Sequence, residues 1–479
     1  MAAEAENQPL QQPQPALDDD EECATRPTSG QHILAAINYN SKRQRGAPFD
    51  EASDGKLGSV YTMVTELLLA RGDWGRRSAL RNKADGVLKL PSSYHLLLGT
   101  AQGKGLQWGR LGYGMWPPPL VNYCRGFDIL TRKGRLIATL ANAQAAWENS
   151  WPAAMPDYLK TAEASRGGVW ELAPQAFVFH PSKGEANPYN ELQNAFHASS
   201  AASSGSQVEN AWILKPSDGS KGDRIRIMVE LEEINRFLQH EAEKHALGDP
   251  VSSWVVQKYI HNPLLLEDGR RKFDMRCWVL LDPDYNIKLY RHGVLRTSAV
   301  EYNPNDLSNR FSHLTNHCIA AEHENYGHYE PTNELFYAAF DDELIRRFPE
   351  IAEKVGSVLQ RVVLPQVRRT VVQTLLAGRE TLENNGDYYR SFQLFGYDFL
   401  VDEDLRVWLC EINASPAVAE ALLPGLCSAL VRECIDPVCP PNQETMSSLE
   451  EYHAAGLQAK ETGDAFEMLY ENATQKDES

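Results

Sequence analysis

The chain has 479 residues, of which 42% are hydrophobic, so it is long enough to bury several cores and to divide into two or three domains. Its formal net charge of −18 excludes the overall basic character of a typical nucleic-acid-binding protein. No stretch approaches the roughly 18 uninterrupted apolar residues of a membrane span, and the opening MAAEAENQPLQQPQ lacks the basic and apolar regions of a signal peptide. We therefore expect a cytoplasmic protein that binds neither nucleic acid nor a membrane.

Most of the negative charge lies at the two ends of the chain. Residues 1–30 contain seven acids against Arg26, and residues 440–479 contain nine acids against two lysines. The first segment has few side chains that could fill a core, so we predict that it is disordered. The last segment is predicted to be an acidic tail, in which residues 448–472 could form one exposed helix.

The first predicted elements form a small α/β unit. Residues 32–38 (HILAAIN) are an apolar run of strand length, and residues 59–70 (SVYTMVTELLLA) have apolar side chains at helical spacing. A strand followed by a helix predicts an N-terminal α/β domain over residues 31–130. The mainly small and polar residues 181–210 predict a mobile surface loop inside a central domain, residues 131–262.

Strands and helices alternate from residue 211 onward. The predicted strands are AWILK, SWVVQKYI, KFDMRCWVLL, NIKLYRHGVLRT, FQLFGYDFLV and LRVWLCEIN. Helices are expected over residues 231–246 and from about residue 335 to residue 382. This order favours α+β or α/β cores with a cleft between two lobes, of which we expect α+β, with the second lobe over residues 263–439.

The loop that follows AWILK is rich in glycine and lysine. Within eight positions it contains Lys215, Ser217, Gly219, Ser220, Lys221 and Gly222. Glycines let backbone N–H groups approach phosphate oxygens, and lysines supply positive charge. The loop lacks the order of a Walker A motif, and taken alone it is more typical of an ordinary turn than of a phosphate site.

The strand KFDMRCWV has two chemically different faces. Side chains alternate along a strand, which gives two sets: Lys272, Asp274, Arg276 and Trp278 on one face, and Phe273, Met275, Cys277 and Val279 on the other. The second set predicts a core face. The first fits either the floor of a polar cleft or a solvated outer face with internal ion pairs.

The last two predicted strands indicate a hairpin with oxygen ligands. A two-residue loop at 403–404 would place Asp398 opposite Leu409, on the same side as Glu411 and Asn413. Two carboxylates and an amide are hard oxygen ligands, which Mg²⁺ takes alongside nucleotide phosphates. We favour a metal site here over a structural ion pair, because a buried carboxylate without a partner is costly.

These three features together indicate ATP chemistry, and the surrounding residues resemble a known family. Residues 255–304, 313–336 and 388–417 closely resemble the tubulin-tyrosine ligase family, as do LLLARGDWGRR, GRLGYG and LVNYCRGFDILTRKGRL nearer the N-terminus. The resemblance covers residues 31–438 and is strongest over 254–418. It implies an ATP-grasp fold, in which two α+β lobes close on ATP and Mg²⁺ behind a small α/β N-terminal domain.

The resemblance also implies an activity and its partners. The expected reaction is ATP-dependent addition of L-tyrosine to the C-terminal glutamate of detyrosinated α-tubulin, presented by the αβ dimer, through an acyl phosphate. Such an enzyme would be cytoplasmic and associated with microtubules. Two alternatives remain: a glutamate or glycine ligase of the same family acting on tubulin or another acidic tail, and a catalytically silent tubulin-binding protein.

Motif by motif, the resemblance implies roles for individual residues. The catalytic face that receives the acceptor and the transferred phosphate would consist of Lys272, Asp274, Arg276 and Arg296. The nucleotide site would consist of Lys133, Lys215, Gln257, Lys258, Tyr259, Ile260, Lys272, Asp274, His313, Leu314, Thr315 and Asn316. The Mg²⁺ ligands would be Asp398, Glu411 and Asn413.

An acidic enzyme that acts on an acidic tail needs a local basic surface. The candidates, all in the first domain, are Arg71, Arg76, Arg77, Arg81, Lys83 and Arg110. The charge pattern alone is equally typical of a solvated helix end. The resemblance to the tubulin-contacting first domain of the family favours a binding surface.

Overall fold

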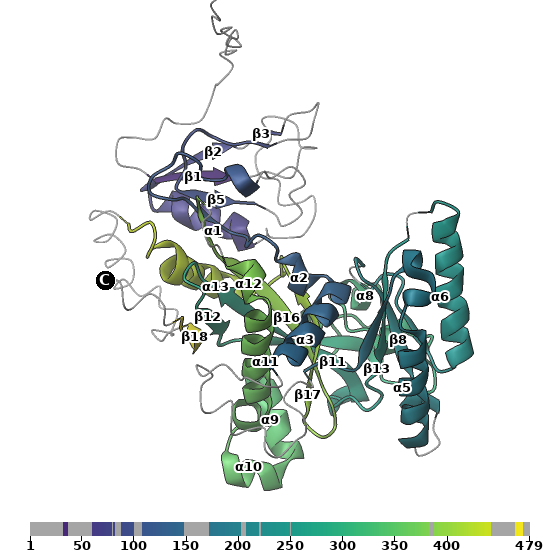
Figure 1. Cartoon of the computed structure of the whole chain (residues 1–479). Coiled ribbons are helices and arrows are strands. Elements are labelled where there is room, and N and C mark those ends of the chain that lie inside the picture. The colour runs from purple at the N-terminus through teal and green to yellow at the C-terminus, as the bar shows by residue number, and fades with distance from the viewer. Residues whose placement is uncertain are drawn as a thin grey trace, which may run out of the picture.

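The computed structural model describes residues 32–36, 60–78, 80–81, 88–99, 108–147, 172–202, 207–219, 222–249, 251–383, 388–441 and 465–472. The disorder predicted for residues 1–30 lies outside these ranges, as do Lys83, Ser220 and Lys221. The strands form an N-terminal parallel sheet, a central antiparallel sheet and a large antiparallel sheet, besides one short strand pair (Figure 1). This arrangement confirms the predicted α+β class, with two lobes that follow a small α/β domain.

The N-terminal sheet is parallel, in the order β15-β6-β5-β1-β2. Its strands are β1 (His32–Ala36), β2 (Trp74–Ser78), β5 (Leu96–Leu98), β6 (Leu120–Val121) and β15 (Arg390–Ser391). The helix α1 (Val60–Ala70) connects β1 to β2 and buries Val60, Val64 and Leu68 at a spacing of four residues. β15 comes from the far end of the chain, so this domain includes residues beyond the predicted segment 31–130.

The central sheet is antiparallel, in the order β7-β10-β8-β9. Its strands are β7 (Ala176–Phe179), β8 (Trp212–Pro216), β9 (Arg226–Met228) and β10 (Trp254–Lys258). The helices α5 (Tyr189–Ala202) and α6 (Leu231–Ala246) cover one face (Figure 1).

The prediction of a mobile loop over residues 181–210 is wrong where the structure describes this segment. The segment contains the 3₁₀ helix η2 (Pro181–Ala186), α5 and the 3₁₀ helix η3 (Gln207–Asn210). Leu192 and Phe196, four residues apart on α5, enter the core formed around Trp212. The polar composition belongs to the outer face of an amphipathic helix, whose packing orders the segment.

The largest sheet is built on β11. Its strands are β11 (Arg271–Leu281), β12 (Ile287–Tyr290), β13 (Val294–Glu301), β14 (Glu334–Phe336), β16 (Gln393–Val401), β17 (Val407–Asn413) and β18 (Phe466–Tyr470). One edge of β11 pairs with β13 and then β12, and the other pairs with β16, all antiparallel. Every residue of β11 is buried.

Helices pack against this sheet and connect it to the other domains. They are α2 (Asp128–Thr131), α3 (Lys133–Trp147), α7 (Arg310–His313), α8 (His317–Ala320), α9 (Tyr337–Arg347), α10 (Pro349–Val355), α11 (Leu364–Ala377), α12 (Arg379–Leu382) and α13 (Leu423–Leu430). The short strands β3 (Leu80–Arg81) and β4 (Leu88–Lys89) pair with each other. None of the helices among the described residues is both long and apolar enough to cross a membrane.

The two predicted faces of β11 are confirmed. Phe273, Met275, Cys277 and Val279 enter the main core together with residues of α9 and α11. Trp278 enters a second core shared with α1 and α13. The charged residues on that face are buried as well, which excludes the solvated outer face and supports the polar cleft.

The acidic tail contributes a strand to this sheet. β18 pairs with β12, and Phe466, Leu469 and Tyr470 are buried in the two cores. Arg368 and Arg379 bind Glu467 and the Tyr470 hydroxyl at 3.1 and 3.0 Å. The exposed helix predicted over residues 448–472 is therefore wrong for its described part, because alternating apolar side chains cover the edge of β12.

We predict that Phe273→Ala destabilises the fold by about 3–5 kcal/mol, because it leaves a cavity in a fully packed core. Phe273 is 1% exposed, and its ring meets that of Phe340 at a centroid distance of 5.1 Å. Urea unfolding followed by circular dichroism measures the loss. Phe336→Ala, which truncates a ring that is 37% exposed, is the matched control and should cost about 1 kcal/mol or less.

Candidate functional site

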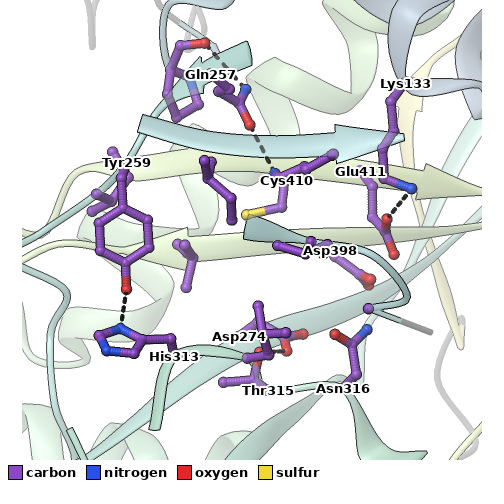
Figure 2. A pocket seen from close by; sticks show the side chains of 18 of the residues that line it. Lys133, Gln257, Tyr259, Asp274, His313, Thr315, Asn316, Asp398, Cys410 and Glu411 are labelled. Atoms are coloured by element: carbon purple, nitrogen blue, oxygen red, sulfur yellow. Dashed lines mark hydrogen bonds and ion pairs between the residues drawn. The ribbon is translucent and has the colours of Figure 1, made fainter. Parts of the chain in front are cut away.

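A pocket opens between the central sheet and the sheet built on β11 (Figure 2). Most of the predicted site residues line it: Lys133, Lys215, Gln257, Lys258, Tyr259, Ile260, Lys272, Asp274, Arg296, His313, Leu314, Thr315, Asn316, Asp398 and Glu411. Arg276 and Asn413 lie behind this lining and contact Asp398. Residues that are far apart in the sequence therefore converge on one cavity.

Buried charges alternate along the floor of the pocket. The Arg296 guanidinium donates to Asp274 Oδ1 at 2.5 Å and to Asp398 Oδ2 at 2.8 Å. Arg276 donates to both oxygens of Asp398, with Nη2 at 2.9 Å from Oδ2. Thr315 donates its hydroxyl proton to the other oxygen of Asp274. Burial raises the pKa of Asp274, although the charge of Arg296 opposes this effect.

The register of β16 and β17 brings the second carboxylate to the pocket. Asp398 pairs directly with Glu411, whereas Phe399 pairs with Leu409, so Cys410 is the extra residue of a β-bulge. The predicted pairing of Asp398 with Leu409 is therefore wrong, because the turn is longer than two residues and β17 contains a bulge. The shared side is correct, since Asn413 donates to Asp398 and Glu411 at 3.2 and 3.4 Å.

Glu411 binds the amine of Lys133, the first residue of α3. Their N–O distance is 3.1 Å, and Lys133 also donates to the carbonyl of Gly219 at 2.8 Å (Figure 2). Burial raises the pKa of Glu411, but the charges of Lys133 and Arg296 outweigh burial and lower it to about 2. Glu411 is therefore ionised at neutral pH. Lys133 thereby connects the glycine-containing loop to the β17 carboxylate.

Lys215 faces the pocket from β8. Its ammonium donates to Gln257 Oε1 at 2.8 Å, and Gln257 in turn donates to the carbonyl of Pro174 at 3.2 Å. Burial lowers the pKa of Lys215, and the nearby charge of Lys133 acts in the same direction. The two lysines thus concentrate positive charge at one end of the cavity.

Lys258 borders the pocket, but its ammonium is bound on the other face of the central sheet. On β10 it shares the face of Trp254 and Val256, which α5 and α6 cover. Its ammonium donates to the Glu209 carbonyl at 2.7 Å and to the Asn210 side chain at 3.1 Å. The role of Lys258 in the nucleotide site stays a prediction, and in this structure its charge is bound on the far face of the sheet.

Sequence reasoning missed the apolar part of the lining. It consists of Pro174, Ile213, Ile225, Leu400 and the side chain of Cys410. Strand alternation could have located two of these residues, because Ile213 is two positions from Lys215 and Leu400 is two positions from Asp398. One end of the pocket is therefore apolar and could hold a flat ring, while the other end is charged.

The donor set near Glu411 fits a hard cation such as Mg²⁺. Within the described residues no three His, Cys, Asp or Glu side chains converge as a metal cluster, so a metal would depend on the carboxylates of Asp398 and Glu411 and the amide of Asn413. Glu411 is ionised and its side chain is 27% exposed. Asp398 is saturated by two arginines, which leaves Glu411 and Asn413 as the more available ligands.

The predicted basic surface loses Arg71 in this structure. Arg71 binds Asp73 at 2.9 Å and Asp436 at 2.7 Å, so its charge is neutralised inside the protein. Arg77 is partly exposed and Arg110 is exposed. Among the candidates whose side chains are described, Arg76, Arg77 and Arg110 remain for this surface, while the side chains of Arg81 and Lys83 lie outside the described residues.

Comparisons with known proteins agree on one family. The profile of the Tubulin-tyrosine ligase family matches residues 132–447, which include every predicted site residue. Tubulin glycylase 3C of Tetrahymena thermophila is 32% identical over 252 residues, 50% of this chain and 22% of that protein. Tubulin monoglycylase TTLL3 is 32% identical over 245 residues in Danio rerio and 31% identical over 253 residues in Homo sapiens, 49% of this chain in both cases. The chain spans only 29% and 30% of those two relatives.

We predict that Asp398→Asn destabilises the protein by about 3 kcal/mol, because Arg276 and Arg296 lose a buried counter-charge. Both guanidinium groups contact this carboxylate in the pocket floor. Thermal and urea unfolding measure the effect. Glu411→Gln is the comparison, with an expected cost of about 1 kcal/mol or less, because its ion pair with Lys133 lies at the open side of the pocket. Equal losses in the two variants would contradict the buried network.

Proposed function

Because the chain belongs to the tubulin-tyrosine ligase family, we propose that it is an ATP-dependent carboxylate–amine ligase that adds glycine to glutamate carboxylates in the acidic tail of tubulin. The observation that carries the ligase activity is the pocket, where lysines, Arg296 and an ionised glutamate surround one cavity. The choice of glycine is supported by the relatives named tubulin glycylases. Glycine therefore replaces the tyrosine expected from the sequence motifs.

The apolar end of the pocket suits the adenine ring. Ile213 and Leu400 project from opposite sheets, and the backbone of residues 257–260 forms the adjoining edge. A flat ring between aliphatic side chains gains van der Waals contact. At the opposite end, Lys133 and Lys215 would neutralise phosphate oxygens.

The chemistry requires activation of a carboxylate. Transfer of the γ-phosphate of ATP to a tail glutamate gives an acyl phosphate and ADP. The glycine amine then attacks the acyl carbon, loses a proton and displaces phosphate, forming an amide bond. Arg296 supplies positive charge in the pocket itself, and Arg276 adds its charge from directly behind the lining. Their ion pairs with Asp274 and Asp398 fix their orientation in advance.

A bound Mg²⁺ would neutralise phosphate charge and align the γ-phosphate for transfer. Asp398, Glu411 and Asn413 are the residues of this chain that would hold it. The low pKa of Glu411, about 2, keeps that ligand ionised across the physiological range. The ammonium of Lys133 then remains close to the phosphates, because Gly219 also binds it.

We predict that ATP-dependent incorporation of labelled glycine into tubulin exceeds that of labelled glutamate or tyrosine, and that Glu411→Gln reduces it at least 100-fold. The substitution removes a negative ligand with little change in volume. Scintillation counting of the tubulin measures incorporation, with each amino acid assayed separately. Preferred use of glutamate or tyrosine would reject the glycine proposal and retain the ligase.

Glu403→Gln is the matched control for this substitution, because Glu403 is exposed in the turn of the same hairpin. It should retain normal incorporation. Near-normal turnover of Glu411→Gln at saturating Mg²⁺ would contradict the assigned metal ligand.

We also predict that Arg77→Glu combined with Arg110→Glu weakens tubulin binding several-fold at low salt and leaves ATP binding unchanged. Exposed charges are screened beyond about 10 Å at 0.1 M salt, so the wild-type affinity should fall as ionic strength rises. Co-sedimentation with microtubules at increasing salt measures the effect of the substitutions on tubulin binding and its dependence on ionic strength. Calorimetry measures ATP binding. The control reverses Arg236 and Arg346, which are exposed elsewhere. An equal loss in the control would exclude a specific basic surface.

A further inference from the structure

A buried chain of hydrogen bonds runs along one wall of the pocket. The Lys272 ammonium lies 3.0 Å from the Tyr259 hydroxyl, which lies 2.7 Å from His313 Nδ1. His313 Nε2 lies 2.9 Å from the carbonyl oxygen of Asp306. Figure 2 shows the phenol ring of Tyr259 pointing directly at the imidazole. All three side chains are buried.

The donor and the acceptor of each of these hydrogen bonds follow from the last one, between His313 and the Asp306 carbonyl. A carbonyl oxygen only accepts, so His313 Nε2 must donate to Asp306. Burial, followed by the charge of Lys272, lowers the pKa of His313, so the ring is neutral and Nδ1 accepts the proton of the Tyr259 hydroxyl. The hydroxyl oxygen is then left to accept from Lys272.

The Lys272 ammonium lies among aromatic rings, which makes the Tyr259 hydroxyl important as its acceptor. Its ammonium lies 4.6 Å from the ring centroid of Tyr259 and 5.7 Å from that of Tyr302. Within the described part of the chain, the Tyr259 hydroxyl is the hydrogen-bond acceptor found for it. Asp274 favours its charged form, whereas Lys215 disfavours it, and the Cys410 thiol, whose pKa burial raises to about 12, remains neutral.

The hydrogen bonds also join separate parts of the fold. Tyr259 directly follows β10 of the central sheet, Lys272 is on β11, and His313 is the last residue of α7. Residues 314–316, immediately after α7, line the pocket. These hydrogen bonds therefore cross the junction of the two lobes at the cavity itself.

We propose that Tyr259 and His313 are positioning residues that aim the Lys272 ammonium into the pocket, where it contacts the phosphates of the bound nucleotide. The inference rests on the proposed ATP-dependent function. A free lysine side chain has many rotamers, and one hydrogen bond to a fixed hydroxyl removes most of them. The two remaining N–H groups are then available to phosphate oxygens.

The charge of Lys272 gives the proposal a measurable signature. Burial lowers the pKa of this lysine to about 8, so the cation is lost as the pH rises through that value. A hydroxyl that accepts from the ammonium favours the charged form. Removing the hydroxyl should therefore shift the loss of the cation to lower pH.

The test is the affinity for ADP, measured by calorimetry between pH 6 and pH 9.5 on the full chain. Wild-type affinity should fall on the alkaline side. Tyr259→Phe keeps the ring but removes the acceptor, so we expect about tenfold weaker binding at pH 7 and an alkaline fall about one pH unit lower. Lys258, whose pKa is also about 8, keeps all of its partners in this variant and does not produce the shift.

Three further variants separate positioning from stability. Tyr285→Phe removes an equally buried hydroxyl, which donates to the Leu375 carbonyl at 2.7 Å away from the pocket, and should leave the pH profile unchanged. His313→Gln retains an acceptor and a donor and should recover most of the affinity that His313→Leu loses. Equal effects of the two histidine variants would contradict the proton direction argued here.

The outcomes also distinguish this inference from the proposed function. If the ADP affinity of wild type and of Tyr259→Phe falls at the same alkaline pH, the positioning role is overturned, whatever amino acid the protein ligates. A shifted fall in a protein that incorporates no amino acid into tubulin would reject the ligase and retain the positioning role. Wild-type failure to bind ADP would overturn both.

Discussion

Buried charge is the constraint on which this structure depends. Transfer of an unpaired carboxylate or guanidinium out of water costs several kcal/mol, so such groups persist in a core only when they are paired. β11 places an apolar set of side chains in the main core and, on its other face, Asp274 and Arg276 in the floor of the pocket. The pairing partners must therefore come from β13 and β16, which fixes the register of these strands.

The same pairing prepares the pocket for polyanions. Arg296 is shared between Asp274 and Asp398, so its guanidinium is already ordered before a ligand arrives. Lys133 connects the glycine-containing loop of the central lobe to Glu411 of the large sheet. The lobes thus meet through charged groups that a nucleotide and its metal could engage with little rearrangement, which supports catalysis by positioning and electrostatics.

Strands from distant parts of the sequence complete the N-terminal sheet and the large sheet. β15, near residue 390, extends the N-terminal parallel sheet, and β18, near residue 468, covers the edge of β12. Both additions pair strands that are separated by more than 150 residues. The N-terminal domain is consequently attached to the large lobe, and a potentially adhesive sheet edge is covered by the chain itself.

The sequence by itself determined the features that depend on local periodicity and composition. The alternation along β11 gave both of its faces, and the spacing in the hairpin placed Asp398, Glu411 and Asn413 on one side. Tertiary structure alone decided the bulge at Cys410, the direction of the Lys258 ammonium and the helices within residues 181–202 and 207–210. Each of these depends on partners far away in the sequence: the strand that pairs with β17, the helices that cover β10, and the core that receives Leu192 and Phe196. Local sequence patterns specify which face of a strand or helix a side chain occupies, but only tertiary packing decides which residues that face contacts.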